Sequence, residues 1–118
     1  MLIIAQDPDV PMSTPGTPDF DEMMARWSAF NQMLLEGDHW LGGGSLQPVS
    51  TATTVRKASG ATPLVSDGPF AETKEVIAGF YLITAADLDE ALTLAKQVPV
   101  DRGSVEVRPI LYRPNPLA

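Results

Sequence analysis

The sequence has no cysteine among its 118 residues and only a single histidine. Disulfides, thiolate metal ligands and cysteine nucleophiles are therefore excluded, and this cysteine usage is typical of a cytoplasmic protein. A metal site would have to be assembled almost entirely from carboxylates, so we expect no bound metal.

Positive charge and long hydrophobic runs are also scarce. Eight Lys and Arg residues stand against fifteen Asp and Glu residues, which gives a formal net charge of −7. Nucleic-acid binding needs clustered basic residues and is disfavoured. No apolar run approaches the ~20 residues of a membrane span, and residues 2–5 are too short for a signal-peptide core. We expect a cytoplasmic protein that binds neither nucleic acid nor membranes.

Recognisable cofactor motifs are missing as well. Gly42-Gly43-Gly44 follows a strand-like run, but the Gly-Lys-Ser/Thr of a phosphate loop does not follow it and no helix begins there. We therefore expect no cofactor. The glycines instead indicate a bulge, a bend, or the close approach of another backbone or a ligand.

The length of 118 residues indicates one globular domain, which we place at residues 1–118. The hydrophobic content of 44% is ordinary for such a domain. Four prolines and one glycine make residues 7–18 a loop, and residues 113–118 form a tail.

Two helices are predicted from their caps and their apolar spacing. Thr17 suits the N-cap of the first helix and Gly37 suits its C-cap. Apolar residues recur between them at helical spacing: Phe20, Met23, Met24, Trp27, Phe30 and Leu34. The second helix starts at Asp87, which has capping-box spacing to Glu90, and it ends by Pro99.

Four strands and a hairpin complete the prediction. The strands are expected at residues 2–5, at 39–41 leading into the glycines, at 76–83 and at 105–112. Residues 51–57 and 63–65 flank the turn at Ser59-Gly60 and predict a hairpin inserted between the second and third of these strands. Pro109 indicates an edge position or a bulge for the last strand.

This order predicts an α+β fold, the split β-α-β arrangement of ferredoxin-like domains with an inserted β-hairpin. Both helices would cover one face of an antiparallel sheet. Residues 76–83 are apolar on both faces, so a monomer would expose either Ile77, Tyr81 and Ile83 or Val76, Phe80 and Leu82. We therefore predict a homodimer whose sheets pack face to face into a closed or nearly closed barrel.

One segment carries a family resemblance. Asp67-Gly68-Pro69-Phe70-Ala71-Glu72-Thr73-Lys74-Glu75 closely resembles the DGPF branch of the YCII-related family. Flanking segments resemble the family pattern too, including Leu41-Gly42-Gly43, Thr53-Thr54-Val55-Arg56 and Gly103-Ser104-Val105-Glu106-Val107-Arg108-Pro109. The resemblance covers residues 37–111 and implies a ferredoxin-like dimeric α/β barrel.

The resemblance implies less about function. Most members of this branch have no established activity, and some are encoded beside extracytoplasmic-function sigma factors, which implies an accessory role. Other branches include enzymes of aromatic-compound breakdown that use a His-Asp pair whose histidine lies on the first helix. Residues 17–36 contain no histidine here, so this chain lacks the match to that pair.

The motif residues suit both a turn and a functional site. Pro69 fixes its own φ and moves Gly68 out of the α region, and Asp67 is placed to accept a hydrogen bond from the Phe70 N–H, as an N-cap does. Histidine is the residue type best suited to proton transfer near neutral pH. We therefore name His39 and Asp67 as candidate catalytic residues. The candidate ligand-binding residues are Phe70, Glu72, Lys74, Glu75 and Tyr81.

Three functions follow from these features. The favoured hypothesis is a homodimeric small-molecule-binding domain without an assigned activity, accessory to a sigma-factor circuit. The second is a lyase-like or isomerase-like enzyme that uses His39 and carboxylates on a small aromatic or organic acid. The third and weakest is a protein-interaction module that uses the loop at residues 7–18. A purely structural role for the motif, and an ordinary surface role for His39, stay open.

Overall fold

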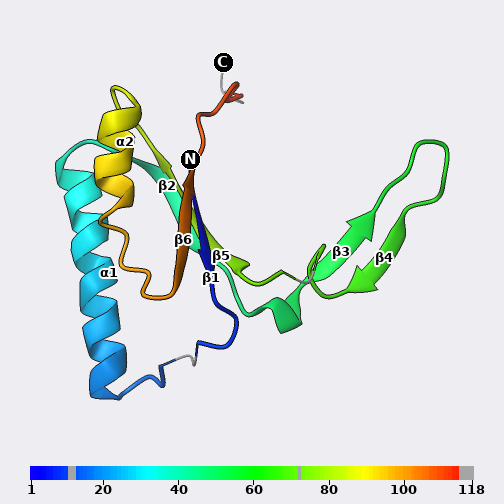
Figure 1. Cartoon of the computed structure of the whole chain (residues 1–118), viewed down its shortest axis with the longest axis horizontal. Coiled ribbons are helices and arrows are strands. Elements are labelled where there is room, and N and C mark those ends of the chain that lie inside the picture. The colour runs from blue at the N-terminus through cyan, green and yellow to red at the C-terminus, as the bar shows by residue number, and fades with distance from the viewer. Residues whose placement is uncertain (11–12, 72, 115–118) are drawn as a thin grey trace.

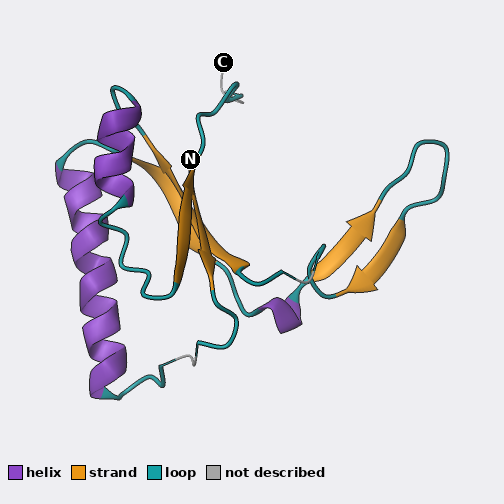
Figure 2. Ribbon diagram, viewed as in Figure 1, coloured by secondary structure: helices purple, strands orange, loops and turns teal. Residues whose placement is uncertain are grey.

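The computed structural model describes residues 1–10, 13–71 and 73–114. Glu72, two residues of the Pro-rich loop and residues 115–118 of the tail lie outside this description. The elements in chain order are β1 (Leu2–Gln6), α1 (Pro18–Glu36), β2 (Trp40–Ser45), η1 (Val49–Thr51), β3 (Thr53–Arg56), β4 (Leu64–Asp67), β5 (Val76–Ile83), α2 (Leu88–Ala95) and β6 (Gly103–Val107). Figure 2 shows how these helices and strands are arranged.

The main sheet has four antiparallel strands in the order β2-β5-β1-β6. Without the inserted hairpin, the elements follow the β-α-β-β-α-β order, which confirms the predicted α+β fold. Both helices lie on one side of the sheet, and the β3–β4 hairpin projects from the other side (Figure 1). The predicted edge position of the last strand is also confirmed, because β6 lies at one end of the order.

The core lies between the helices and one face of this sheet. Its most deeply buried side chains are Leu2 of β1 and Leu34 of α1, both with no exposed surface. The remaining buried members are Ile4, Phe30, Tyr81, Leu94, Ala95 and Val98. A side chain of leucine size contributes about 1.5–3 kcal/mol when fully buried, so these few residues supply much of the apolar stabilisation.

Both helices begin where the sequence predicts. The Thr17 hydroxyl accepts from the Phe20 N–H at 3.3 Å, and the Gly37 N–H bonds to helix carbonyls at the other end of α1. Asp87 accepts from the Glu90 N–H at 2.8 Å. The Glu90 carboxylate accepts a hydrogen bond from the N–H of Ala86, whereas a standard capping box would use the N–H of Asp87. The capping box is therefore displaced by one residue.

The apolar stripe of α1 is only partly covered. Phe30 and Leu34 are buried, whereas Met24 is 46% exposed. The 19 residues of α1 span about 28 Å, but a five-residue strand such as β1 spans only about 17 Å. The first turns of the helix therefore extend past the sheet that its other turns cover.

The glycine run lies inside β2, and both structural reasons for it are present. The pairing of β2 with β5 shifts between Trp40 and Gly42, which is a bulge or similar irregularity. A Cβ atom on Gly43 would lie 2.8 Å from the carbonyl oxygen of Phe80. The predicted close backbone approach is confirmed at this residue.

The last strand is shorter than the predicted range of residues 105–112, because β6 ends at Val107. Its partner β1 starts at Leu2, and the Arg108 N–H already bonds to the carbonyl of Met1. Pro109 has no N–H to donate to a neighbouring strand. The alternating pattern continues past Val107, but Pro109 interrupts the backbone pairing.

Candidate functional site

The face of the sheet turned away from the helices carries a row of paired residues that crosses all four strands. Gly44, Phe80, Ile3 and Glu106 lie opposite one another in the pairing of β2, β5, β1 and β6. Phe80 points away from the core because its neighbour Tyr81 is in the core and strand side chains alternate. We call this side of the sheet the open face.

Glycine makes the β2 end of the open face flat. A Cβ on Gly44 would lie 3.6 Å from the Phe80 ring, and one on Gly42 would lie 3.7 Å from the Leu82 side chain. The absence of side chains at Gly42 and Gly44 therefore lets Phe80 and Leu82 lie close to the backbone of β2. A flat apolar face of this kind suits packing against another layer.

The opposite end of the open face is polar. The Ser104 hydroxyl lies 3.1 Å and 3.3 Å from the two carboxylate oxygens of Glu75. Glu106, also on this face of β6, pairs with Arg108 at 2.6 Å. Ionised carboxylates only accept hydrogen bonds, so this end of the face offers acceptors to a bound group.

Tyr81, a candidate ligand-binding residue, lies on the covered face of the sheet. Its ring stacks with Trp27 at 6.5 Å and makes edge contacts with Phe30 and Trp40. Its hydroxyl donates to Asn31 at 2.6 Å. Burial raises the pKa of this phenol above its ordinary value. These contacts make Tyr81 the centre of an aromatic cluster in the core.

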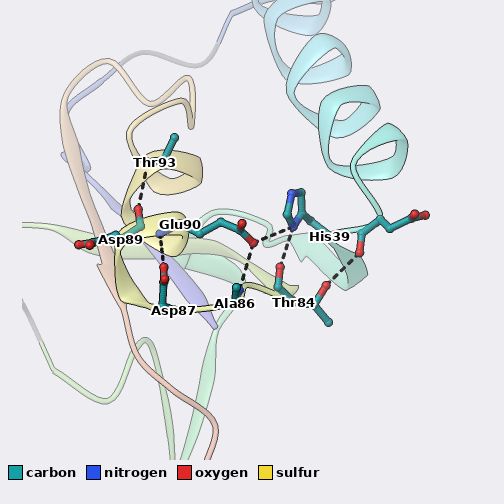
Figure 3. A network of polar contacts seen from close by, with 8 residues as sticks. His39, Thr84, Ala86, Asp87, Asp89, Glu90 and Thr93 are labelled. Carbon is teal, nitrogen blue, oxygen red and sulfur yellow. Dashed lines mark hydrogen bonds and ion pairs between the residues drawn. The ribbon is translucent and has the colours of Figure 1, made fainter.

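His39 lies where the end of α1, the end of β5 and the start of α2 meet (Figure 3). Its Nδ1 is 2.8 Å from the carbonyl oxygen of Thr84 and 3.7 Å from the Glu90 carboxylate. A carbonyl can only accept, so Nδ1 carries the hydrogen in this contact. The other ring nitrogen faces Gly37, where an added Cβ would lie 3.0 Å from it.

Backbone contacts fix the same junction. The Thr84 N–H donates to the carbonyl of His39 at 2.9 Å, and the Thr84 hydroxyl donates to the carbonyl of Asp38 at 2.9 Å. Asp38 has a positive φ of 57°, a conformation that Asp adopts more readily than most residues. His39 therefore connects secondary-structure elements through its backbone and its Nδ1.

The motif residues lie at the base of the hairpin. Asp67 is the last residue of β4, paired with Thr53, and its side chain is exposed. Within the described residues, the expected bond from the Phe70 N–H to Asp67 is not formed. The turn is held instead through Gly68, whose N–H donates to Ala52 at 2.8 Å and whose carbonyl accepts from Thr54 at 2.7 Å.

Gly68 has a φ of +95°, which a residue with a side chain rarely adopts. Arg56 of β3 donates to the carbonyl of Phe70 at 2.7 Å, while the Phe70 side chain is 64% exposed. The Asp-Gly-Pro-Phe segment therefore closes the base of the hairpin through its backbone groups.

The candidate residues do not gather at one place within the chain. Glu75 lies at the polar end of the open face, His39 lies at the junction of α1 and α2, and Asp67 lies on the projecting hairpin (Figure 1). Lys74 is exposed. Sequence reasoning missed Ser104 and Glu106. Their alternation with the apolar Val105 and Val107 is the signal that could have placed them on the open face.

The described residues contain no group of three or more His, Asp or Glu side chains arranged to hold a metal ion. None of the helices in the described part of the chain is long and apolar enough to cross a membrane.

The fold and the open face together define a class: an α+β domain that covers one face of its sheet with helices and leaves an apolar second face available. The model of the YCII-related domain matches residues 1–112 of this chain. The chain therefore belongs to the YCII-related family.

The chain is also similar to an uncharacterized protein, R00369, of Rhizobium meliloti (strain 1021). The two sequences are 51% identical over 76 residues, which cover 61% of this chain and 60% of that protein. The match thus spans about three fifths of the relative's length.

Proposed function

We propose that this chain is a homodimeric small-molecule-binding domain, in which two open faces pack together and hold a ligand at their polar end. The observation that carries the proposal is the apolar row of the open face, with Phe80 opposite Ile3 and no helix above them. An antiparallel sheet that is apolar on both faces needs a second covering layer.

The total exposed surface supports a second copy as that layer. A compact monomer of 12.7 kDa would expose about 6,200 Å², but this chain exposes 8789 Å². The difference, about 2,500 Å², exceeds the roughly 800 Å² that each partner buries in a standard stable complex. A symmetric dimer uses the same face of both copies, and a flat apolar face can pair with itself in this way.

The polar end of the open face indicates the ligand class. Glu75 and Glu106 supply acceptors, and the net charge of the chain is −7. A neutral or cationic molecule with an apolar body and a hydroxyl or amine donor fits this environment. A carboxylic acid does not, because its charge would oppose the Glu75 carboxylate, whereas the Glu106 carboxylate is already paired with Arg108.

The rival functions have less support. Acid–base catalysis by His39 and Asp67 would need the two side chains to act on one substrate, and they lie in different parts of the chain (Figure 1). An accessory role in a sigma-factor circuit is compatible with a ligand-binding dimer and is supported by the family resemblance alone.

The dimer is tested by light scattering after size-exclusion chromatography at micromolar concentration. Wild-type protein should give about twice the 12.7 kDa chain mass. Phe80→Lys should give the chain mass, because it places a charge on the apolar row. Ser28→Lys, on the exposed surface of α1, should leave the dimer intact. A wild-type monomer would refute the proposal.

The ligand class is tested by thermal unfolding of the dimer with phenol, cyclohexylamine and benzoate. Phenol and cyclohexylamine should raise Tm, because binding to the folded state adds up to about 2.7 kcal/mol at 100 times Kd. Benzoate should leave Tm unchanged, and Glu75→Gln should reduce the response to cyclohexylamine. An equal response to benzoate would contradict the proposed donor ligand.

A further inference from the structure

The β3–β4 hairpin, which we call the arm (residues 53–67), extends away from the rest of the molecule (Figure 1). Val55 and Val65 lie directly opposite each other on one face of the arm, and they are 55% and 68% exposed. Leu64, on the other face, is 68% exposed. The arm thus presents β-branched and aliphatic side chains to solvent near the turn end of its two strands.

A hairpin of this kind is not expected to be stable by itself. Two strands without a covering layer are marginal in water, since neither face is buried. The arm forms a two-stranded sheet separate from the main one, with β3 and β4 paired only to each other. Its apolar residues therefore need a surface that lies outside its own domain.

Contacts at the base of the arm nevertheless fix the direction in which the arm projects. Three hydrogen bonds connect it: the Gly68 N–H to Ala52, the Thr54 hydroxyl to Gly68, and the Arg56 guanidinium to the carbonyl of Phe70. Pro69 restricts the backbone between these contacts. These hydrogen bonds and the fixed φ of Pro69 at the base set the direction in which the arm projects.

From these observations we propose that the arm packs on a second copy of this chain, each copy reaching over its partner. The Val55–Val65 face supplies the contact. The inference rests on the proposed homodimer and adds a second interface to it. Dimerisation would then cover both the arm and the open face.

The position of the arm, on the same side of the sheet as the open face, favours a second copy as its partner. The radius of gyration of the chain is 16.7 Å, whereas a compact domain of this length would have about 13–14 Å. The arm contributes to the same excess surface that the open face does, and both lie on the side of the sheet without helices (Figure 1). In a twofold dimer, the copy that covers one open face is therefore placed to meet the arm beside it.

The first test compares two lysine substitutions on adjacent residues of β4. Val65→Lys changes the apolar face of the arm, and Ser66→Lys, paired with Thr54, changes the other face of the same strand. Val65→Lys should raise the dimer Kd at least tenfold, and Ser66→Lys should change it less than threefold. Analytical ultracentrifugation measures both, and near-UV circular dichroism should show an unchanged core.

The second test needs no variant of the arm. Amide hydrogen exchange followed by mass spectrometry should show slower exchange in residues 53–67 of the wild-type dimer than in the monomeric Phe80→Lys chain, by tenfold or more. Equal exchange in the two, with no effect of Val65→Lys on Kd, would overturn the arm contact and leave the face-to-face dimer standing. A wild-type monomer would overturn both, so the two failures are distinct.

Discussion

Gly43 offers a sharp test of the packing between β2 and β5. A methyl group at this position would lie 2.8 Å from the carbonyl oxygen of Phe80 and 3.1 Å from the ring of Tyr81. The first distance is too short for a carbon and a backbone oxygen, so Gly43→Ala must separate the strands or move the Tyr81 ring. Tyr81 sits among Trp27 and Phe30, which limits that movement.

The expected size of the effect combines two opposing contributions. Overpacking of this kind destabilises by about 1–3 kcal/mol. Replacing glycine by alanine also restricts the unfolded chain, which returns about 0.4–1 kcal/mol. The net loss is about 1–2 kcal/mol, and for a domain of this size it lowers Tm by roughly 3–10 °C.

Gly42 and Gly44 provide matched controls on either side. Their added methyl groups would lie 3.7 Å and 3.6 Å from the nearest atoms, an ordinary contact distance. Gly42→Ala and Gly44→Ala should therefore not lower Tm and should raise it by about 1–5 °C, because only the unfolded-state term of about 0.4–1 kcal/mol remains. Both residues lie on the open face, so the thermal unfolding of all three variants is followed by far-UV circular dichroism in protein diluted below the dimer Kd. Equal losses in the three variants would refute the reasoning, since the close approach exists only at Gly43.

Two further predictions concern carboxylates. Asp67→Asn should change the free energy of unfolding by less than about 0.5 kcal/mol in urea titrations, because this exposed side chain forms no capping bond with the described residues. Asp87→Ala should instead cost about 1 kcal/mol by removing the cap of α2, and equal losses would contradict the observed contacts. Arg26 donates two hydrogen bonds to Asp101 and holds the pKa of the Asp101 carboxyl below its ordinary value. The stabilisation from this pair is therefore present above the unfolded-state pKa of Asp101, and it is lost as pH falls through the lower folded-state pKa. Asp101→Asn should accordingly lower stability at pH 7 and not at about pH 2, and an effect that persists in acid would argue against the ion pair as its source.

Local signals predicted the elements well because the residues that define them are adjacent in sequence. Thr17 and Asp87 lie within three residues of the N–H groups they cap, and the hairpin turn is marked by Gly60, which has a φ of +75°. The strand at Val76–Ile83 has the predicted bounds. In each case the physical cause acts over a few residues, so a single sequence is enough to show it.

Features set by distant partners could not be predicted in the same way. The extent of β6 depends on its pairing with β1, which is about one hundred residues away in the chain. The contact between Ser104 and Glu75 joins strands that are not neighbours in the sheet. The surroundings of His39 depend on how α2 meets the end of β5. The spacing of residues in the sequence does not predict these long-range contacts. The contacts determine which polar residues lie together in one site.

The Asp-Gly-Pro-Phe segment can be interpreted through the groups that it actually uses. A catalytic motif uses its side chains, yet here the bonds at Gly68 and Phe70 involve backbone atoms, and the side chains of Asp67 and Phe70 are exposed. Such residues set the direction of the structure that follows or precedes them, which in this chain is the arm. We therefore expect the Asp-Gly-Pro-Phe segment to fix the direction in which the apolar arm projects. Substituting Gly68 by alanine, which strains its φ of +95°, should then weaken dimerisation in ultracentrifugation without loosening the core seen by near-UV circular dichroism.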